Sequence, residues 1–265
     1  MLYLISTPIG NLEDITYRAV KTLQSCDLIL CEDTRHSQTL LSHYGIDKPL
    51  KSFHSFNEKS KEDFIIDALK NGQNIALISD AGTPGICDPG EALVRRCYQE
   101  NIPITALPGP CAFVAALSLC PFPKDRVQFL GFFEKESLPR LLAFPGITVF
   151  YDAPHRILQT LALLHQHDPA RNICILRELT KHFEEHLLGK PQDLLSHFEK
   201  HPPKGEFVVI CEGSDLDFST LSEKEHVLFL QKEYHLDLAD SIRLAAELRG
   251  QPKRKIYQAI HKKNE

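Results

Sequence analysis

The stretch IALISDAGTPGICDPGEALVRRC, residues 75–97, contains the three parts that decide the fold. It begins with the apolar run 75–78, which is typical of a strand buried on both faces of a sheet. A loop with three glycines and two prolines follows at 79–90. A helix is then expected over 89–101, with Asp88 as its N-cap, Pro89 as its first residue and Glu91 in its first turn. The order of strand, loop and helix predicts one unit of a parallel sheet.

The same alternation runs through the first half of the chain. Short apolar strands are expected at 2–6, 28–31, 50–54 and 104–107. Helices are expected between them, at 11–26, 35–45, 61–72 and 111–120. Asn11 is placed to cap the first helix, with Asp14 in the position of a capping box. Strands with so few polar residues indicate a parallel sheet that is covered on both faces, and therefore an α/β fold.

Four loops follow the carboxyl ends of these strands, where α/β sheets bind their ligands. They read STPIGN (6–11), CEDTRHS (31–37), SDAGTPGICDPG (79–90) and LPGPC (107–111). In the third loop Asp80 could accept hydrogen bonds, and Gly82 and Gly85 would let a ligand approach the backbone. The first loop lacks the GxGxxG pattern and the chain has no Walker A motif, so NAD binding and ATP hydrolysis are not expected.

Two polar clusters are candidates for chemistry on a substrate. CEDTRHS brings together carboxylates, a guanidinium and an imidazole, which suit general base catalysis and phosphate contact. The alternative is a solvated group of ion pairs. RELTKHFEEH (177–186) is a similar cluster in the second half, and its alternative is the charged face of a helix. The histidines show no metal-binding spacing, so no metal is expected.

The second half predicts a second α/β domain and a tail. Strands are expected at 129–133, 147–151, 173–176 and 207–213, with helices at 155–165 and 190–199. We expect an N-terminal domain with a parallel sheet at 1–120, a C-terminal domain with a mixed sheet at 121–213, and an acidic linker at 214–225. The tail, 226–265, is basic near its end and resembles a helix-turn-helix.

Composition limits the remaining possibilities. The net charge of −5 is not that of a typical nucleic-acid-binding protein, so any such contact is expected on a local basic patch. The eight cysteines form no CxxC pair and are expected to be reduced core residues of a cytosolic protein. No signal peptide is expected at the N-terminus. The uncharged stretch 104–122 is interrupted by Pro108, Gly109 and Pro110, so no membrane span is expected there.

Seven motifs in order along residues 2–213 resemble the tetrapyrrole methylase superfamily. They are STPIGNLEDIT, CEDTRHS, SDAGTPGICDPG, LPGPC, FYDAPHRI, RELTKHFEE and KGEFVVICEG. Members that methylate tetrapyrroles typically have a glycine-rich first loop, whereas STPIGN is similar to the branch that methylates ribosomal RNA. One departure is FFEKESLPRLLAFPG at 132–146, which is short and contains Glu134 and Glu136 where the family usually has a longer, basic insertion.

The resemblance implies a fold, a reaction and partners. The fold would be two α/β domains with S-adenosylmethionine in the cleft between them. The protein would be a cytoplasmic homodimer that methylates the 2′-oxygen of a cytidine ribose in the decoding region of 16S rRNA, on the small ribosomal subunit, without acting on DNA or membranes. Two alternatives stay open. One is methylation of a tetrapyrrole or another small molecule, and the other is a non-catalytic RNA-binding factor for ribosome assembly.

The resemblance and the polar clusters together predict the site residues. Matching positions imply cofactor contacts from Pro8, Ile9, Asp80, Ala81, Gly82, Thr83, Ile86, Pro110, Cys111, Ala112, Tyr151, Ala153 and Leu179. The two clusters also provide the candidate catalytic residues Glu32, Asp33, Glu178, Lys181 and Glu184. Among these, Lys181 would stabilise an alkoxide and one of the carboxylates would take the proton. Candidate contacts to the RNA substrate come from the same clusters and from the tail: Arg35, His36, Arg177, Lys253, Arg254 and Lys255.

Overall fold

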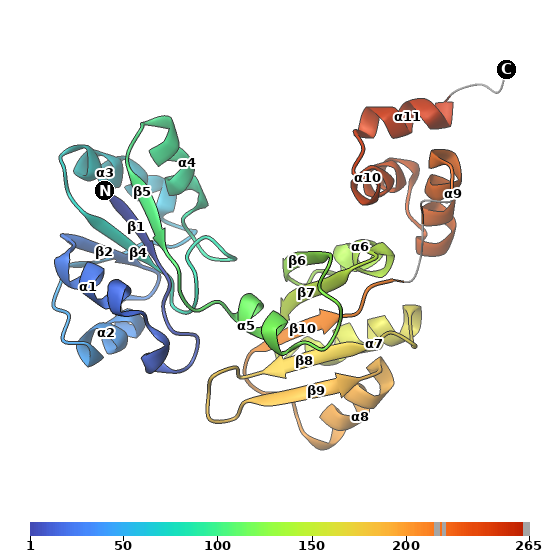
Figure 1. The fold of residues 1–265 in the computed structure, drawn as a ribbon, viewed down its shortest axis with the longest axis horizontal. Helices are drawn as coiled ribbons and strands as arrows, with labels where there is room; N and C mark the ends of the chain where they lie inside the picture. The colour runs from blue at the N-terminus through green and yellow to red at the C-terminus, as the bar shows by residue number, and fades with distance from the viewer. Residues whose placement is uncertain (215–217, 219–220, 262–265) are drawn as a thin grey trace. The chain divides into compact units, whose positions relative to one another are not determined.

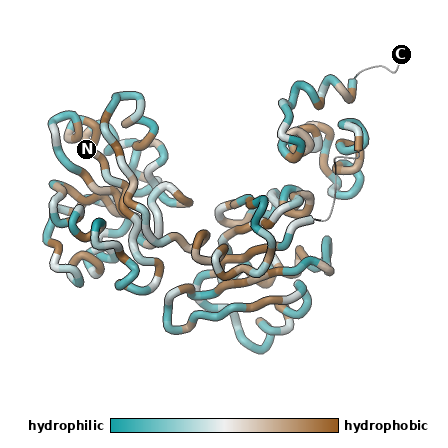
Figure 2. Tube along the Cα trace, in the orientation of Figure 1, coloured by the Kyte–Doolittle hydropathy of each residue, from teal (hydrophilic) through white to brown (hydrophobic). Residues whose placement is uncertain are grey.

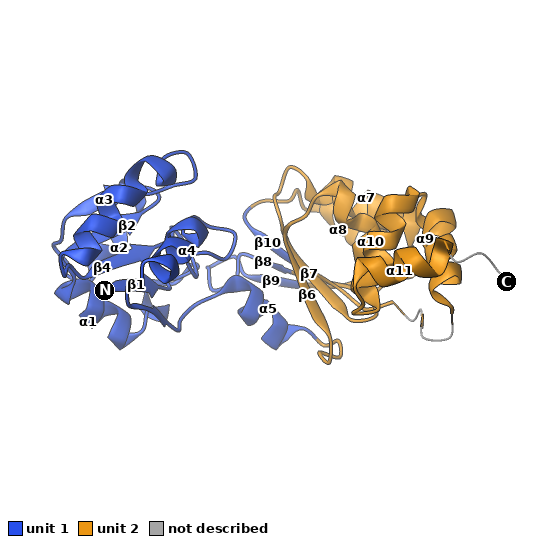
Figure 3. Ribbon diagram, turned by 90° about the horizontal axis from the view of Figure 1, so that it is seen from above, with its two compact units in different colours: residues 1–120, 176–186, 205–208 blue, residues 121–175, 187–204, 209–265 orange. Residues whose placement is uncertain are grey.

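The structure is a computed structural model that describes residues 1–214, 218 and 221–261 (Figure 1). Five residues of the expected acidic linker, 215–217 and 219–220, lie outside the described residues, as do the last four of the tail. Contacts divide the chain into two compact units (Figure 3). The first contains 1–120, 176–186 and 205–208, and the second contains the remainder.

The first unit is built on a parallel sheet of five strands. They are β1 (Leu2–Ile5), β2 (Leu28–Cys31), β3 (Leu50–Ser52), β4 (Ile75–Ile78) and β5 (Ile104–Leu107), in the order β3-β2-β4-β1-β5. Ile5 at the end of β1 pairs with Ile78 on one side and Leu107 on the other. All pairs are parallel, so the carboxyl ends of the five strands share one edge, as the sequence predicts.

Helices cover both faces of this sheet. Figure 1 shows α1 (Tyr17–Ser25) and α2 (Thr34–His43) on one face, and α3 (Glu58–Lys70) and α4 (Glu91–Gln99) on the other. Each face has its own apolar core, one containing Ile29 of β2 and the other Leu30. Figure 2 shows hydrophobic residues along the strands, in agreement with their burial. A fifth helix, α5 (Ala112–Leu119), follows β5.

The prediction of one helix over 11–26 is wrong at its start. Asn11 accepts a hydrogen bond from the N–H of Glu13 and begins a single 3₁₀ turn, η1 (Leu12–Asp14). The chain is extended again at Ile15, and α1 starts only at Tyr17. The hydroxyl of Thr16 accepts the N–H of Ala19 at 3.1 Å, so Thr16 is the N-cap. Asn11 therefore caps the separate 3₁₀ turn and does not cap α1.

The prediction of Asp88 as the N-cap of the fourth helix is also wrong. The helix begins at Glu91, and Gly90 occupies the capping position without a side-chain hydrogen bond. Gly82, Gly85 and Gly90 all have positive φ, and so does Cys87 at +66°. These left-handed residues turn the loop back before the helix starts, and this places Asp88 beside the Ser79 hydroxyl, with which it forms a hydrogen bond.

The second sheet is mixed. Its strands are β6 (Val127–Phe132), β7 (Ile147–Asp152), β8 (Ile173–Arg177), β9 (Glu185–Gly189) and β10 (Phe207–Cys211), in the order β6-β7-β10-β8-β9. β6 and β7 are parallel. Backbone hydrogen bonds link Glu178 to Glu206 at one end of β8 and Asn172 to Glu212 at the other, the pattern of an antiparallel pair. Two helices, α7 (Ile157–His167) and α8 (Pro191–Lys200), pack against each other.

Sequence reasoning missed two elements of the second half. The charged-helix interpretation of 177–186 is wrong, because the residues after β8 form a turn and then β9, whose side chains alternate between partial burial and exposure. The segment 132–146 holds a 3₁₀ turn, η2 (Lys135–Ser137), and a short helix, α6 (Leu138–Ala143). Leu138, Leu141 and Leu142 are buried, so this segment is part of the core.

Three helices form the tail: α9 (Glu223–Tyr234), α10 (Leu238–Leu248) and α11 (Lys253–His261). They share an apolar core that also includes Ala143 of α6, and an ion pair of 2.6 Å joins Arg140 to Glu247. A turn with Gly250 at φ +61° connects α10 and α11, as the helix-turn-helix pattern predicts. α9 begins inside the expected linker, where Ser222 and Glu225 form a capping box. Among the described residues, no helix is long and apolar enough to cross a membrane.

Candidate active site

Hydrogen bonds join the three loops that follow β1, β4 and β5. The backbones of Thr7 and Gly82 form a two-way bridge, with N···O distances of 2.8 and 3.0 Å. The hydroxyl of Thr83 donates to the carbonyl of Pro110 at 3.0 Å and lies 2.9 Å from the hydroxyl of Ser6. Three segments that are distant in sequence therefore form one rigid layer at the carboxyl edge of the sheet.

Glycine makes this close approach possible. Gly82 has a φ of +84°, and a Cβ placed on it would lie 3.5 Å from the side chain of Ile9. A Cβ on Gly109 would lie 2.8 Å from the Cβ of Ser6, which is closer than side chains pack. The layer holds most of the cofactor residues that the resemblance implies: Pro8, Ile9, Asp80, Ala81, Gly82, Thr83, Ile86, Pro110, Cys111 and Ala112.

The residues of this layer fit S-adenosylmethionine. Ile9 is nearly buried and Ile86 is 41% exposed, so apolar side chains of the kind that an adenosine ring packs against are present at this edge. The Asp80 carboxylate accepts the N–H of Asp33 at 3.1 Å, and this bond fixes its position at the end of β4. A cationic sulfonium gains from nearby carboxylates, and three of them, Glu32, Asp80 and Asp88, interact electrostatically here.

Glu32, the first residue after β2, has the properties of a general base. Burial raises its pKa, and the charges of Asp88 and Asp80 add to the effect, so that the pKa reaches about 7. Its Oε1 atom is buried and has no hydrogen-bond partner among the described residues. Burial and Asp80 also raise the pKa of Asp88 to about 6. Sequence reasoning missed Asp88 as a site residue, because the Asp-Pro pair looks like a helix start.

The pKa of the neighbouring Asp33 is lowered, whereas that of Glu32 is raised. It is the N-cap of α2, and its Oδ1 accepts the N–H of Arg35 at 2.8 Å. The guanidinium of Arg35 donates to Oδ2 at 2.9 Å, and these bonds lower the pKa of Asp33 to about 2. Asp33 is therefore ionised and bound, whereas Glu32 can exchange a proton near neutral pH. His36 donates from Nε2 to the backbone carbonyl of Asp80 at 3.1 Å.

The cluster after β8 lies against the first loop. A Cβ on Gly10 would overlap the Lys181 side chain and would lie 2.7 Å from Thr180 Oγ1. Lys181 Nζ donates to Glu178 Oε1 at 2.8 Å and to Glu206 Oε2 at 2.7 Å, and these carboxylates raise its pKa. The structure thus brings Lys181 and Glu178 together, as predicted, and adds Glu206, whose place in KGEFVVICEG was the only sequence signal for it.

Two other predicted residues of this cluster have bonds within the loop. Glu184 accepts the N–H of Thr180 at 2.6 Å and lies 2.7 Å from His186 Nε2. Thr180 and Glu178 both have positive φ, which for residues with side chains is a strained conformation. Glu184 therefore holds a strained turn in place. Arg177 forms an ion pair of 2.9 Å with Glu185. A catalytic role for Glu184 and an RNA contact for Arg177 stay predictions.

The remaining predicted residues lie in different parts of the chain. Leu179 is buried in the first unit. Tyr151 and Ala153 belong to the second unit, where Tyr151 meets Phe129 and Phe132 edge to face. Lys253, Arg254 and Lys255 form the exposed first turn of α11. Within the ranges that the structure describes, no three His, Cys, Asp or Glu side chains are arranged to hold a metal ion.

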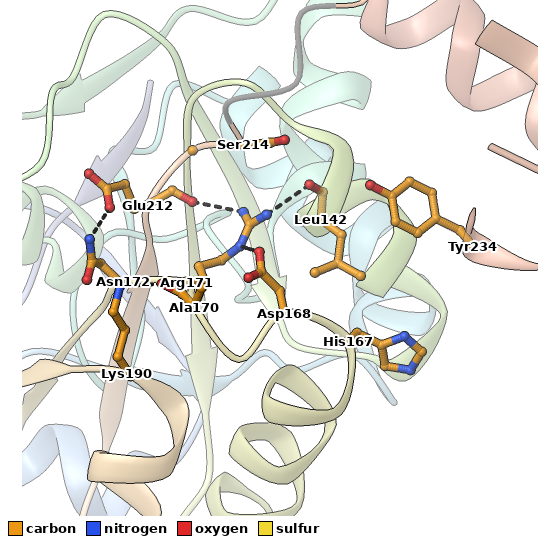
Figure 4. A pocket seen from close by; sticks show the side chains of 11 residues that line it. Leu142, His167, Asp168, Ala170, Arg171, Asn172, Lys190, Glu212, Ser214 and Tyr234 are labelled. Carbon is orange, nitrogen blue, oxygen red and sulfur yellow. Dashed lines mark hydrogen bonds and ion pairs between the residues drawn. The ribbon is translucent and has the colours of Figure 1, made fainter. Parts of the chain in front are cut away.

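The second unit also has a cavity of about 520 Å³ that none of the predicted residues line (Figure 4). Arg171 closes one side of it. The guanidinium donates to Asp168 at 2.7 Å and to the carbonyls of Glu212 and Leu142 at 2.9 and 3.0 Å. Figure 4 shows Tyr234 across from this group. These bonds use three of the five N–H donors of the guanidinium, so Arg171 links α6 to the residues that follow α7 and β10.

Comparisons with known proteins identify the family of this chain. The family model described as "Tetrapyrrole (Corrin/Porphyrin) Methylases" matches residues 1–195. A protein named ribosomal RNA small subunit methyltransferase I from Synechocystis is 39% identical, with 97% of this chain and 96% of that protein covered. One of the same name from Escherichia coli O157:H7 is 40% identical over 97% and 93%. A Thermotoga maritima protein of that name is 42% identical, but it covers 81% of this chain with 99% of its own length.

Solved structures match the fold at low sequence identity. A cobalt precorrin-4 methyltransferase superposes with a TM-score of 0.63 at 15% identity, covering 80% of this chain and 94% of that one. A diphthine synthase gives 0.62 at 10% identity, covering 82% and 91%. A uroporphyrin-III C-methyltransferase from Thermus thermophilus, complexed with S-adenosylhomocysteine, gives 0.58 at 14% identity, covering 80% and 96%. Three enzymes with different names thus share one architecture, and the fold alone does not identify a substrate.

Proposed function

Because this chain belongs to the tetrapyrrole methylase family, and within it to the ribosomal RNA small subunit methyltransferases I, we propose that it methylates 16S rRNA with S-adenosylmethionine. The acceptor that we propose is the 2′-oxygen of a cytidine ribose in the decoding region. Bound S-adenosylmethionine supplies an electrophilic methyl group on a positively charged sulfur. The residues of this chain have to bind it, align the ribose hydroxyl with the methyl group and receive the hydroxyl proton.

The observation that carries the proposal is the contrast between Glu32 and Asp33. A ribose hydroxyl is a weak nucleophile until its proton is removed, and a carboxylate with a pKa of about 7 is suited to remove it near neutral pH. Asp33 is held by Arg35 with a pKa of about 2, so it cannot take that role. We therefore assign to Glu32 the role of accepting the proton. Asp33 caps the N-terminus of α2 and so fixes where that helix begins.

Lys181 is the candidate for stabilising negative charge on the ribose oxygen. An ammonium group has three N–H donors, and the structure uses two of them on Glu178 and Glu206. The third can donate to the oxygen as its proton leaves. Glu206 is 76% exposed at its side chain, so its bond to Lys181 can be exchanged for one to a substrate. Glu178 is then the residue that keeps Lys181 in position.

The tail supports RNA binding. Lys253, Arg254 and Lys255 are exposed on consecutive positions at the start of α11, in a chain whose net charge is −5. We propose that they contact RNA phosphates, which makes binding sensitive to salt. The separate apolar core of α9, α10 and α11 keeps this basic turn in place as the end of a folded module.

A homodimer is also part of the proposal. The sequence of α5, AFVAALSL, has no charge, yet only Ala116 is fully buried, and Val114 and Leu119 are 54% and 49% exposed. An apolar helix with so little burial is typical of an interface between subunits. We propose that α5 contacts a second copy of this chain. Replacing Val114 and Leu119 by glutamate should lower the mass measured by light scattering to that of one chain.

One experiment tests the reaction against its alternatives. The protein is incubated with S-adenosylmethionine that carries a labelled methyl group and with small ribosomal subunits that lack this modification. Label in 16S rRNA at one linkage that resists alkaline hydrolysis supports the proposal, because a 2′-O-methyl group blocks attack on the neighbouring phosphate. Label in porphyrinoid substrates alone would favour small-molecule methylation. Absence of both label and cofactor binding in calorimetry would favour a non-catalytic assembly factor.

A further inference from the structure

The loop after β3 presents an aromatic ring to solvent at the same edge of the sheet as Glu32. Phe56 is 97% exposed, although phenylalanine normally avoids water. β3 pairs with β2, and the N–H of Phe53 donates to the carbonyl of Cys31 at 2.7 Å. Cys31 is the residue before Glu32. The loop that carries Phe56 therefore starts beside the proposed base.

This loop is held in one conformation by its own side chains. Asn57 Oδ1 accepts the N–H of His54 at 3.0 Å, and Asn57 Nδ2 lies 2.8 Å from His54 Nε2. The amide nitrogen is a donor, so Nε2 is the acceptor of this hydrogen bond. Lys61 donates from Nζ to the hydroxyl of Ser52 at 2.8 Å. Phe56 is therefore held out by a braced turn and not by a loose chain.

Basic residues are frequent in the chain on either side of Phe56. Residues 48–61 contain four lysines and one carboxylate, in a chain with a net charge of −5. Lys59 is exposed, and Lys51 lies over the ring of Phe64 at 3.4 Å. An exposed aromatic ring among cations is the arrangement by which proteins hold single-stranded nucleic acid, since the ring stacks on a base and the cations contact phosphates.

Polar atoms at the base of the loop also lack partners. His54 Nδ1 and Glu58 Oε2 are buried and form no hydrogen bond with any described residue. Buried polar atoms are nearly always paired in native proteins. The base of the loop therefore has polar atoms whose partners the described residues do not supply.

We propose that Phe56 stacks on an unpaired base of the substrate RNA, adjacent to the ribose that is methylated, and that His54 and Asn57 are positioning residues that fix the ring for this contact. The proposal rests on the proposed function, because it deepens the description of that same site. Unpaired bases are what RNA-specific proteins usually recognise, and stacking on an aromatic ring tolerates any base. Stacking here would orient the adjacent ribose toward Glu32.

The chain has no tryptophan, which allows a direct test. The Phe56→Trp variant carries a single indole, whose fluorescence we expect a short oligocytidylate to quench on binding. The matched control is Tyr98→Trp, because Tyr98 is 71% exposed in the last turn of α4, before the chain returns to the opposite edge of the sheet. Its fluorescence should not change. An unchanged signal from the Phe56→Trp variant at RNA concentrations that saturate the protein would overturn the proposal.

Affinity and turnover give the second test. Phe56→Ala should weaken RNA binding about tenfold, the size expected for losing one stacked base. Phe56→Tyr should keep the wild-type affinity, and all variants should bind S-adenosylmethionine equally in calorimetry. Wild-type affinity and methylation rate in Phe56→Ala would refute the stacking role while leaving the proposed function intact. Failure of the unmodified protein to label rRNA would instead reject the proposed function and this inference with it.

Discussion

Glu32 and Asp33 are adjacent in sequence but differ in environment. Glu32 points into a partly buried group of carboxylates, and Asp33 caps a helix and binds Arg35. The pKa values of about 7 and about 2 separate their chemical roles. Pairs of carboxylates whose environments move their pKa values apart recur in enzymes that need one base and one fixed charge.

Glu32→Gln removes the proposed base and keeps its shape. We expect the rate of methyl transfer in a single turnover to fall by about 10²- to 10⁴-fold, the usual contribution of general base catalysis. Cofactor affinity measured by calorimetry should change little. Asp33→Asn is the control, since asparagine also caps helices and the rate should fall much less. Equal losses in the two variants would argue against Glu32 as the base.

The pH dependence of the rate should follow Glu32. The carboxylate is active when ionised, so the single-turnover rate should rise with pH and level off above about 7. Asp88→Asn removes a negative charge that raises this pKa, so the rise should move to lower pH. A profile that stays in the same place in the Asp88→Asn variant would show that Asp88 does not act on the titrating group.

The raised pKa of Glu32 also predicts how the stability of the folded protein depends on pH. The pKa of Glu32 in the folded state, about 7, lies above the value of 4.5 that is usual for glutamate, so the folded state binds more protons than the unfolded state between those values. The contribution of Glu32 to stability is therefore largest below pH 4.5 and is lost as pH rises toward 7. Glu32→Gln should raise the melting temperature at pH 8 relative to wild type more than it does at pH 5. An equal change at both pH values would contradict this.

At the scale of elements, the site depends on loops that touch without space for a side chain. Gly10 is the point where the first loop meets the turn between β8 and β9, and a Cβ there would overlap Lys181 and Thr180. The glycine-rich loop after β4 needs left-handed backbone at four positions before α4 can start. The first loop and the loop after β4 were expected from the sequence, but the turn between β8 and β9 and the contacts among these segments were not.

Gly10→Ala should therefore displace Lys181. We expect a loss of about 1–3 kcal/mol in the free energy of unfolding, typical of overpacking at a close contact, together with a large loss of methylation. Gly189→Ala is the control, since a Cβ there would lie 3.3 Å from Asp193 Cβ, a contact that a small shift relieves. Denaturant unfolding and labelled methyl transfer measure the two effects. Normal activity in Gly10→Ala would mean that Lys181 need not be held there.

At the scale of the whole molecule, charge is distributed unevenly. The chain is acidic overall, whereas the first turn of α11 has three consecutive basic residues. The T. maritima relative matches only 81% of this chain, so a protein of that family can lack about a fifth of it. The proposed phosphate contacts of α11 should therefore be separable from the proposed methyl-transfer site by mutation.

Replacing Lys253, Arg254 and Lys255 by alanine tests this separation. Each phosphate contact to a single strand contributes about 0.7 to the slope of log affinity against log salt, so the slope should decrease by about 2. Cofactor affinity should be unchanged. A double replacement of Lys224 and Lys232 on α9 serves as the control for a loss of charge. A salt slope equal to that of the wild type in the triple variant would place the phosphate contacts elsewhere.

Much of the fold was predictable because apolar spacing is a local property. The strands 28–31, 75–78 and 104–107 were placed to within a residue, since buried parallel strands have few polar residues. Errors occurred where two local signals competed. Asn11 and Thr16 are both good N-caps, and Asp88 resembles one. The strand β9 was missed because half of its residues are polar, and α6 because its six residues are too few for a helical period.

Sequence patterns alone were enough to predict the fold class and, through the ordered motifs, the family, and they also predict that ligands bind at the carboxyl edge of the sheet. The proposal that Glu32 and not Asp33 is the base needed the folded arrangement. A pKa depends on burial and on charges within a few ångströms, and Glu32, Asp80 and Asp88 reach one another only when β2 and β4 pair. The exposure of Phe56 is likewise a property of the folded loop, because a phenylalanine in a sequence is expected inside.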